Sequence, residues 1–455
     1  MGFKHVLVIP YPAQGHVIPM MELSQNFVKH GFKITFVNTD YNHKRVLENN
    51  NELLGEEVIS LVSIPDGLEP WEDRNDLGIL SEAIFSVMPG KLEELIQRIN
   101  DASEEDEKIS CIVADLNMGW ALQVAEKMNI RCAAFWPTSA ALLSFLFTVP
   151  KMIDDQIIDN NGSPLKNQMI EMAPTMPVMS TQNLLWNCIG DSATQKIIFD
   201  VVNKNNAAAN LADRIICNSA YNLEPGAFSL TPKIQPIGPL LASNRQGDSS
   251  GSFWQEDSTC LKWLDQQTQK SVIYIAFGSF TVFDKTQFQE LALGLELSGR
   301  PFLWVVRPDL ISNDSDAYPE GFQERVGSRG LMIRWAPQQK VLSHPSVACF
   351  LSHCGWNSTM EGVANGVPFL CWPYFADQFT NESYICDVWK VGLKFDKDEN
   401  GIIRGVEIQK KVGQILSDEK IMARVLELKE LAMLSVGECG QSRQVFNNFI
   451  EWMQI

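Results

Sequence analysis

Short apolar runs alternate with amphipathic stretches from the start of the chain. Residues 6–9 are continuously apolar, as in a parallel strand that is buried on both faces. A loop follows, then a predicted helix from about residue 17 to residue 30, closed by Gly31, and a second strand at 33–37. Further strand-like runs lie at residues 111–114, 132–136 and 215–217. Strands that alternate with helices in this way predict a doubly wound α/β domain.

A polar segment at residues 242–258 interrupts the alternation. Because it is rich in Ser and Gly, we interpret it as a linker between domains. The alternation resumes beyond it, with strand-like runs at residues 272–277, 302–306, 331–335, 348–352 and 369–372. We therefore expect a first domain over 1–241, a second over 259–435, and a last helix within 436–455 that packs back on the first. Two such domains in tandem would face each other across a ligand cleft.

Length and net charge indicate two globular domains and exclude some classes of binding partner. A chain of 455 residues with 45% hydrophobic and 20% charged residues suits two globular domains. The formal net charge of -18 argues against nucleic acid or an anionic membrane surface as a partner. No apolar run is long enough to span a bilayer, and the first one is too short for a signal peptide.

The ten cysteines point to a reducing compartment. Most of them lie inside apolar runs, and no two form a Cys-x-x-Cys pair. We therefore expect buried free thiols and a cytoplasmic protein, without a disulfide or zinc framework. The one Asp-x-Asp, at Asp314 and Asp316, lies in a polar stretch, and we interpret it as a turn instead of a metal site.

The segment from Trp335 to Gln378 carries the strongest functional pattern. A buried strand at 348–352 leads through His353 into a helix that opens at Asn357. The amide groups at a helix N-terminus bind anions. Since no Lys or Arg lies between residues 340 and 390, neutral donors, the histidine and the helix dipole would have to hold a diphosphate here.

Other side chains of this segment suit the remaining parts of a nucleotide sugar. Trp335 offers a flat face for a base, and Glu361, one helical turn beyond the helix start, can accept hydrogen bonds from ribose hydroxyls. Asp377 and Gln378 offer paired groups for sugar hydroxyls. An ordinary strand–helix–strand unit would explain any one of these residues, but not the whole set.

The 44-residue segment closely resembles the signature box of the plant secondary-product UDP-glycosyltransferases, a group of family 1 glycosyltransferases. The resemblance extends to Gly15-His16 followed by Pro19, and to Phe277-Gly278-Ser279, so it covers essentially the whole chain. It implies an α/β fold of the GT-B type, with two Rossmann-like doubly wound domains facing across a cleft. It also implies a UDP-sugar as co-substrate, with no cofactor and no metal.

The resemblance implies which residues hold each part of the donor. For uracil they are Trp335 and Ala336, and for ribose Gln338 and Glu361. For the diphosphate they are His353, Gly355, Asn357 and Ser358. For the sugar they are Trp356, Asp377 and Gln378. Thr138, just after the strand at 132–136, is a candidate to reach the sugar because of its position, and Ser279 is a further donor-binding candidate. A Gln at the end of the box favours UDP-glucose over UDP-galactose.

Transfer to an alcohol needs a base, because the hydroxyl is a poor nucleophile until its proton leaves. Of the six histidines, His16 lies after the first strand at a helix N-terminus, which favours a neutral ring. Asp115 ends the strand at 111–114 and could orient His16 and stabilise the imidazolium, although a helix cap is the alternative. The resemblance likewise places His16 as base and Asp115 as its partner.

These roles predict a direct displacement with inversion. The acceptor hydroxyl, deprotonated by His16, would attack the anomeric carbon while UDP departs. The helix start at Asn357 and the ring of His353 would stabilise the charge that develops on the leaving group. We expect the chain to act as a monomer on a UDP-sugar and a small-molecule acceptor.

The acceptor pocket should be formed largely by the first domain. Its candidates are aromatic and Met residues, namely Met88, Trp120, Trp136, Phe145 and Trp186, with Phe280 and Phe375 closing it from the second domain. Such a pocket would suit flat phenolics such as flavonoids. Terpenoids are not excluded.

Other functions are weaker. A nicotinamide dehydrogenase on the same kind of sheet would need Gly-x-Gly-x-x-Gly after the first strand, which residues 11–16 do not supply. A sensor could bind a UDP-sugar without turnover, but it would not need both His16 and Asp115. A different UDP-sugar donor stays open, as does hydrolysis, which an acceptor-dependent rate would set apart from transfer.

Overall fold

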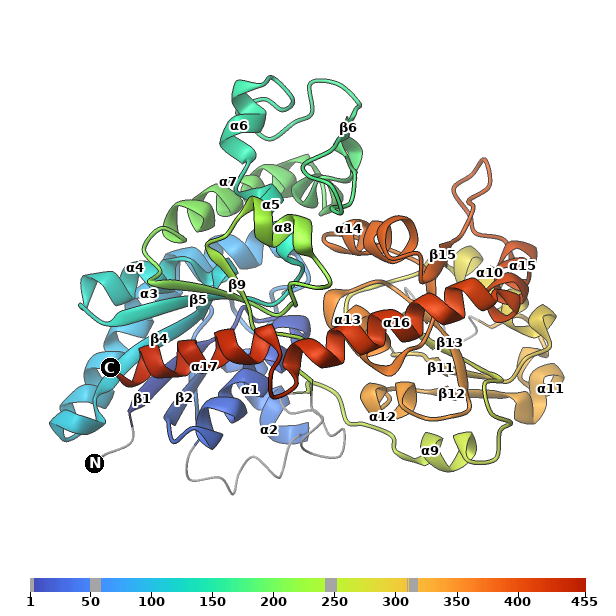
Figure 1. Cartoon of the computed structure of the whole chain (residues 1–455), viewed down its shortest axis with the longest axis horizontal. Helices are drawn as coiled ribbons and strands as arrows, with labels where there is room; N and C mark the ends of the chain where they lie inside the picture. The colour runs from blue at the N-terminus through green and yellow to red at the C-terminus, as the bar shows by residue number, and fades with distance from the viewer. Residues whose placement is uncertain (1–3, 50–58, 242–251, 309, 311–317) are drawn as a thin grey trace.

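The computed structural model describes residues 4–49, 59–241, 252–308, 310 and 318–455. Two parallel sheets organise the chain, with strand orders β3-β2-β1-β4-β5-β8-β9 and β12-β11-β10-β13-β14-β15. Both orders are those of a doubly wound Rossmann sheet, in which the direction of winding reverses between the first and fourth strands. The structure confirms the prediction of two such α/β domains, which lie side by side in Figure 1.

The first sheet is built from buried apolar runs at the predicted places. Its strands are β1 (His5–Ile9), β2 (Lys33–Thr39), β3 (Ile59–Ile64), β4 (Ile109–Asp115), β5 (Arg131–Trp136), β8 (Arg214–Cys217) and β9 (Ile234–Pro236). The helices around it are α1 (Gln14–Lys29), α2 (Asp40–Asn49), α3 (Leu77–Asp101), α4 (Trp120–Lys127), α5 (Ala140–Leu146), α6 (Val149–Asp154), α7 (Ser192–Ala208) and α8 (Pro225–Leu230). The short strands β6 (Met169–Ile170) and β7 (Met179–Ser180) form a separate antiparallel pair.

The second domain repeats this plan. Its strands are β10 (Val272–Ala276), β11 (Phe302–Val305), β12 (Gly330–Ile333), β13 (Val347–Ser352), β14 (Phe369–Cys371) and β15 (Gly392–Lys394). Its helices are α9 (Thr259–Leu264), α10 (Lys285–Ser298), α11 (Phe322–Val326), α12 (Gln338–Leu342), α13 (Trp356–Asn365), α14 (Gln378–Ser383), α15 (Gly405–Ser417) and α16 (Glu419–Val436).

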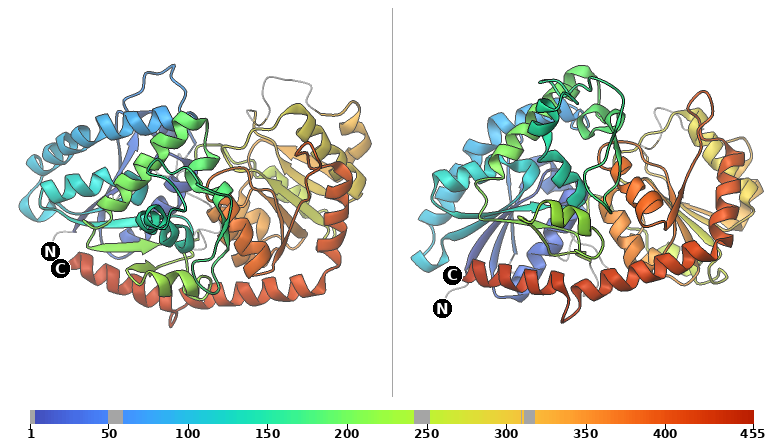
Figure 2. Two further views of the ribbon diagram at one scale, coloured as in Figure 1. Left: turned by 90° about the horizontal axis from the view of Figure 1, so that it is seen from above. Right: turned by 45° about the horizontal axis from the view of Figure 1, so that its top comes forward.

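The last helix, α17 (Gln441–Gln454), returns to the first domain. Figures 1 and 2 show α16 and α17 running one after the other across both domains. Phe446 stacks on Phe27 of α1 with their rings parallel and 6.2 Å apart, and Phe449 lies 6.0 Å from the same ring. An apolar face of the first domain is therefore covered by the end of the chain.

Helix α1 begins three residues before the predicted start, at Gln14. Gly15 and His16 therefore belong to its first turn instead of to the preceding loop. Pro19 lies inside this helix and has no N–H to donate to the Gly15 carbonyl, four residues earlier. The amide nitrogen of Asn357 donates to that carbonyl instead, at 2.7 Å, from the second domain.

Part of the predicted linker is packed. Residues 242–251 lie outside the described residues, as do Asp314 and Asp316. Phe253 is buried in the first domain, and its N–H donates to the Gln14 side chain at 3.1 Å. The N–H of Asp257 donates to the Trp335 carbonyl at 2.9 Å, so the end of this segment contacts both domains.

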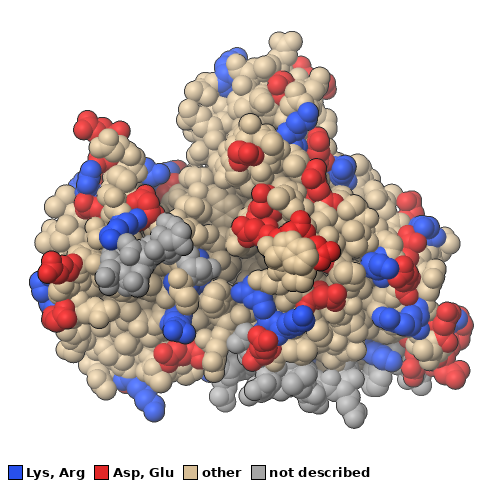
Figure 3. All heavy atoms as spheres, turned by 180° about the vertical axis from the view of Figure 1, so that it is seen from behind, with Lys and Arg blue, Asp and Glu red and all other residues tan. Residues whose placement is uncertain are grey.

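Several general features can be stated for the described residues. None of their helices combines the length and the apolarity needed to cross a membrane. They contain no group of three or more His, Cys, Asp or Glu side chains that could hold a metal ion. All ten cysteines are free, and seven of them are buried. Figure 3 shows acidic and basic side chains interspersed on one face, with the surface hollowed between the two domains.

Candidate active site

A cavity of about 310 Å³ lies between the domains and is lined by both. Residues that follow β1 and β5 line it from the first domain, and residues that follow β10 and β13 line it from the second. In each sheet this is where the strand order reverses, at the carboxyl ends of the strands. Ligands bind at this position in doubly wound folds.

The predicted base and its partner are in direct contact. His16 Nδ1 lies 2.6 Å from Asp115 Oδ2, and the two side chains are 25% and 0% exposed. The other carboxylate oxygen accepts from the backbone and side-chain nitrogens of Asn117, at 2.9 and 3.0 Å. Asp115 is therefore both the cap of a short turn and the partner of His16. Because Nδ1 faces the carboxylate, Nε2 is the nitrogen that a substrate would meet.

The ionisation of His16 differs from the expectation based on the helix start alone. Burial lowers the pKa of His16, but the charge and hydrogen bond of Asp115 outweigh it, so the pKa is raised above the ordinary value of 6.5. Asp377 acts in the same direction. A histidine with a raised pKa is the stronger base once it is neutral.

The nucleobase end of the cavity is aromatic. Trp335 lines it, and Trp254 stacks on Trp335 with ring centroids 5.8 Å apart and an angle of 20°. Ala336 lines the cavity beside it. One face of the Trp335 indole is thus supported by a residue of the predicted linker, and a uracil ring would use the other.

The two predicted ribose ligands belong to one hydrogen-bonded cluster. The Gln338 amide nitrogen donates to Ser358 Oγ at 2.8 Å and to Glu361 at 2.6 Å, and its oxygen accepts from the Tyr274 hydroxyl at 3.1 Å. Gln339 donates to the second oxygen of Glu361 at 3.1 Å. Burial raises the pKa of Glu361 to about 7, and the two amide hydrogen bonds act against this shift.

The predicted diphosphate site contains a tightly enclosed histidine. Gly278 has φ +67°, and a Cβ atom there would lie 2.5 Å from His353 Nε2. A Cβ atom at Gly355 would lie 2.4 Å from the same nitrogen. Burial lowers the pKa of His353 to about 4, so the ring is neutral at physiological pH. The N-terminus of α13, where Asn357 and Ser358 line the cavity, adds backbone donors.

The predicted sugar ligands are fixed by neighbours. Asp377 accepts from the Thr138 hydroxyl at 2.9 Å and from Asn381 at 2.7 Å, and burial raises its pKa. The side-chain oxygen of Gln378 accepts from the backbone N–H of Tyr374 at 2.7 Å. A sugar would therefore meet the amide nitrogen of Gln378. Ser279, which follows β10, also lines the cavity.

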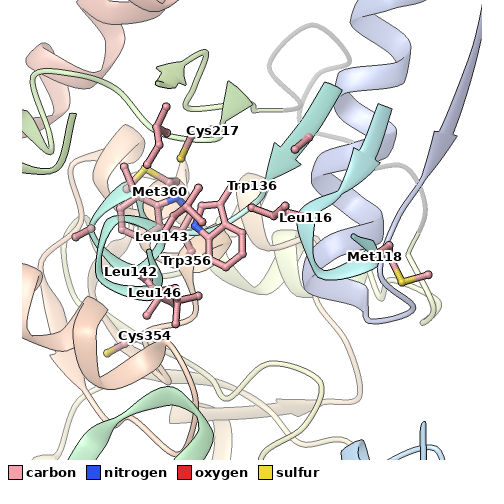
Figure 4. Packing of buried hydrophobic residues seen from close by; sticks show 14 of the residues in the cluster. Leu116, Met118, Trp136, Leu142, Leu143, Leu146, Cys217, Cys354, Trp356 and Met360 are labelled. Atoms are coloured by element: carbon pink, nitrogen blue, oxygen red, sulfur yellow. The ribbon is translucent and has the colours of Figure 1, made fainter. Parts of the chain in front are cut away.

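Trp356 lines the cavity, but its ring N–H is used in a contact between the domains. Its indole is buried at the domain interface, where the ring N–H donates to the Asn218 carbonyl at 2.7 Å. Figure 4 shows the ring among Trp136, Met360 and leucines of α5. The indole N–H therefore holds the two domains together, and only the rest of the residue can face a sugar.

The acceptor end of the cavity departs most from the sequence prediction. Trp136, Phe280 and Phe375 line the cavity. The other four candidates are core residues that do not line it, namely Met88, Trp120, Phe145 and Trp186. Their side chains are at most 3% exposed because they fill the layer between helices and sheet.

Branched aliphatic residues take their place. They come from α1, α3, α5, α7 and the short turn η5 (Leu185–Cys188) with the residue that follows it, and comprise Ile18, Leu77, Leu142, Leu185, Ile189, Ile198, Val201 and Val202. The expected aromatic and Met-containing pocket is thus corrected to a mixed one, in which these aliphatic residues join the aromatic Tyr11, Trp136, Phe280 and Phe375. The sequence could not show this, because it does not reveal which face of each helix meets the cavity.

The lining residues that were not predicted include Glu256, Tyr274, Gln339 and Asn117. Tyr274 lies within an apolar strand run, and Glu256 lies in the polar linker, so neither carried a signal. Gln339 directly follows a predicted ligand. Asn117 follows Asp115 by two residues, a spacing typical of a side-chain turn, which could have drawn attention to it.

A nucleotide-binding cluster on one doubly wound domain, facing a histidine–aspartate pair on the other, defines a nucleotide-sugar transferase. Residues 237–425 match the family described as UDP-glucoronosyl and UDP-glucosyl transferase. UDP-glycosyltransferase 83A1 of Arabidopsis thaliana is 45% identical over 100% of this chain and 97% of that protein. A 7-deoxyloganetin glucosyltransferase of Catharanthus roseus is 34% identical over 94% of this chain and 92% of its own. The chain belongs to the plant family 1 UDP-glycosyltransferases.

Solved structures show the same GT-B fold. A UDP-glucosyltransferase from Polygonum tinctorium, capable of glucosylating indoxyl and solved with 3,4-dichloroaniline, has a TM-score of 0.83 at 28% identity. That match covers 100% of this chain and 99% of the other. Phytolacca americana UGT2, complexed with UDP-2fluoro-glucose and pterostilbene, has a TM-score of 0.81 at 27% identity and covers 99% of both chains.

Proposed function

We propose that this UDP-glycosyltransferase moves glucose from UDP-glucose to a hydroxyl of a small lipophilic acceptor, with His16 as the base. The observation that carries the proposal is the short contact between His16 and Asp115 at the cavity that the donor residues line. His16 Nε2 takes the acceptor proton as the acceptor oxygen bonds to the anomeric carbon. The bond from that carbon to UDP breaks, UDP leaves with the electron pair, and the centre inverts.

The leaving diphosphate is stabilised by neutral groups in this proposal. His353 has its pKa held at about 4, so it donates as a neutral ring. The N-terminus of α13 supplies backbone N–H groups and the positive end of the helix dipole. These donors perform the role that a divalent cation has in other transferases, so we propose that the reaction proceeds in the presence of a chelator.

Glucose is the proposed sugar because Gln378 ends the donor segment and lines the cavity, and the bond of its side-chain oxygen to the Tyr374 N–H leaves the amide nitrogen for a sugar. Two of the related proteins are named glucosyltransferases, one from Catharanthus roseus and one from Gardenia jasminoides. UDP-galactose and UDP-glucuronic acid are the donors to compare with UDP-glucose. A preference for either would refute this part of the proposal.

The acceptor wall combines the aromatic residues Trp136, Phe280 and Phe375 with branched aliphatic ones, and the aliphatic part leads us to prefer a bulky saturated alcohol to a flavonoid. A flat ring gains most from aromatic faces, about 0.5–1.5 kcal/mol for each stacked pair beyond burial. Branched aliphatic side chains on α3 and α7 instead offer a rounded surface, which suits the dispersion contacts of saturated rings. We therefore propose a terpenoid-like alcohol, with planar phenolics as the second choice.

The main test follows product mass and UDP release with UDP-glucose and a panel of saturated terpenoid alcohols, flavonoids and stilbenes, with a chelator present. We expect products heavier by one hexose, most rapidly from the saturated alcohols. His16→Ala should lower kcat by about 10²–10⁴-fold. UDP release that does not depend on acceptor would indicate hydrolysis, and UDP-glucose binding without turnover would indicate a sensor.

The chain offers a matched control for this experiment. His344 also contacts an aspartate, with Nε2 3.1 Å from Asp265, but it does not line the cavity. His344→Ala should therefore keep the rate of the unmodified protein. An equal loss in both variants would point to a general loss of folding and would contradict the assignment of His16 as base.

We also propose that the protein works as a monomer in the cytosol. One chain supplies both the base and the donor residues, so catalysis needs no second copy. The free cysteines suit a reducing compartment. Sedimentation of the active protein at micromolar concentration should give a mass near the 51.1 kDa of one chain.

A further inference from the structure

Besides His16, Asp115 has a second side-chain partner, Asn117, which is not part of the proposed His16–Asp115 pair. Asn117 donates twice to Asp115 Oδ1, through its backbone N–H at 2.9 Å and its side-chain nitrogen at 3.0 Å. The acceptor is a carboxylate oxygen, so the nitrogen end of the amide must be the one that faces it. Both donors act on the oxygen that His16 does not use, and they leave Oδ2 for the imidazole at 2.6 Å.

These contacts fix the orientation of the Asp115 carboxylate. Rotation of a carboxylate about its last side-chain bond has broad minima, so one hydrogen bond to His16 does not fix its plane. Two donors on the opposite oxygen do fix it. A fixed carboxylate in turn holds the imidazole in one tautomer, with Nε2 toward the cavity.

The turn that carries Asn117 is itself tied to the acceptor wall. Asn205 of α7 accepts from the Gly119 N–H at 3.1 Å and donates to the Asn117 carbonyl at 3.3 Å. Asn205 is buried, and a Cβ atom on Gly119 would lie 2.7 Å from its side-chain oxygen. Val201 and Val202, in the turn of α7 before Asn205, line the cavity.

We propose that Asn117 is a positioning residue for the transfer reaction: it fixes the Asp115 carboxylate so that His16 presents Nε2 to the acceptor hydroxyl. This inference rests on the proposed role of His16 as base. Asn117 also lines the cavity, so a simple role in acceptor packing is the alternative that the test must separate.

The test compares Asn117→Ala with Asn117→Asp, each alone and combined with Asp115→Ala. We expect Asn117→Ala to lower kcat about tenfold, since a hydrogen bond to a charged group is lost while the backbone donor remains. The KM for UDP-glucose should not change. Asn117→Asp keeps the size of the side chain but cannot donate when ionised. Above neutral pH its kcat should therefore fall at least as much as that of Asn117→Ala.

Two readouts distinguish positioning from packing. Asn117→Asp should regain activity relative to Asn117→Ala as the pH falls, because a protonated carboxyl can again donate to Asp115. In the Asp115→Ala background, Asn117→Ala should lower kcat by less than about twofold, because the carboxylate that Asn117 holds is absent. Thermal unfolding and UDP binding test whether each variant is folded. If Asn117→Ala does not fold, Asn117→Ser takes its place.

Each contrary outcome has its own meaning. An equal loss in both backgrounds, or an Asn117→Asp protein that is more active than Asn117→Ala above neutral pH, would overturn the positioning role and leave packing. A change confined to the acceptor KM would do the same. Retained activity in His16→Ala would instead remove the proposed base itself, so failure of that proposal is visible separately.

Discussion

His16 and His353 border the same cavity, yet their pKa values move in opposite directions. Burial acts downward on both, but His16 has the Asp115 carboxylate against its ring and ends with a raised pKa. The ring of His353 lies between two glycines, and Arg307 adds to the lowering. One histidine is therefore suited to accept a proton, and the other to stay neutral and donate a hydrogen bond.

The first prediction concerns the pH profile. Only neutral His16 can act as base, so kcat/KM should rise with pH through a pKa above 6.5. Asp115→Ala removes the main group that raises this pKa and leaves only the weaker effect of Asp377, so the acid limb should move to lower pH while kcat falls about 10²-fold. Rates measured from about pH 5 to pH 9 test this. An unmoved limb would show that another group controls the rate.

The second prediction concerns donor affinity. Glu361 has a pKa of about 7, and its ionised carboxylate accepts more strongly from ribose hydroxyls than the protonated carboxyl does, so binding of UDP-glucose should tighten between about pH 6 and pH 8. Glu361→Gln should abolish this pH dependence and weaken binding about tenfold or more. Titration calorimetry gives both quantities.

Glu382 provides the control for this prediction. Burial raises its pKa to about 7 as well, but it does not line the cavity. Glu382→Gln should therefore keep the pH dependence of donor binding. If Glu382→Gln removes that dependence and Glu361→Gln does not, the assignment of Glu361 to the ribose is wrong.

At this scale the sequence could single out donor candidates because most of them, apart from Thr138 and Ser279, lie within one short stretch around a strand and a helix start. All of the predicted donor residues line the cavity. Asn117 and Tyr274 were missed because their importance depends on the partners that tertiary structure gives them, Asp115 and Gln338. A single sequence does not show the contact of Tyr274 with Gln338, which lies 64 residues further along the chain, whereas the spacing of Asn117 and Asp115 was a signal that went unused.

At the scale of elements, the loop after β10 and the start of α13 enclose His353 from two sides. The positive φ of Gly278 and the short distance from its Cβ position to the ring leave no room for a side chain. The two glycines thus restrict the position of the imidazole by steric contact, alongside its hydrogen bond with the backbone of Ala276. The elements, and not only the histidine, define this part of the site.

The third prediction tests that arrangement. Gly278→Ala should displace His353, destabilise the protein by about 1–3 kcal/mol and strongly weaken UDP-glucose binding. Gly299, at the end of α10, has a similar φ of +64° but no atoms within 4 Å of its Cβ position. Gly299→Ala should lower stability in the same way but leave binding intact. Equal binding by both variants would contradict the enclosure of His353.

Continuous apolar runs made the strands predictable, whereas helix faces were not. The start of α1 was predicted three residues late, at about residue 17, although Pro19 after the first turn leaves the helix intact because its missing bond is replaced. The acceptor wall was missed for another reason. Amphipathic helices α3 and α7 bury residues on both the sheet side and the cavity side, and periodicity does not tell these sides apart.

At the scale of the whole molecule, single hydrogen bonds join the domains around the cavity. Thr138 donates to Asp377, Asn357 donates to the Gly15 carbonyl, and Trp356 donates to a carbonyl of the first domain. The cleft between two domains was predictable from the repeated α/β pattern. These specific bonds were not, because each joins residues more than 100 positions apart.

The fourth prediction concerns the helix that spans the domains. Phe449 of α17 is 1% exposed and packs against α1, so Phe449→Ala should lower the free energy of unfolding by about 3–5 kcal/mol. Leu434 of α16 is 67% exposed, and Leu434→Ala should change the free energy of unfolding by less than about 0.5 kcal/mol. Urea unfolding of the two variants, followed by tryptophan fluorescence, gives the comparison. Equal midpoints would show that α17 contributes little to the first domain.

The return of α17 has a consequence for synthesis on the ribosome. The first sheet is complete at Pro236, but the helix that covers one of its apolar faces begins only at Gln441. At about 5–20 residues per second, that face waits about 10–40 s for its cover. During this interval Phe27 and its apolar neighbours face water or a chaperone. The yield of folded protein should therefore depend on chaperone supply more strongly than the stability of the finished enzyme would suggest.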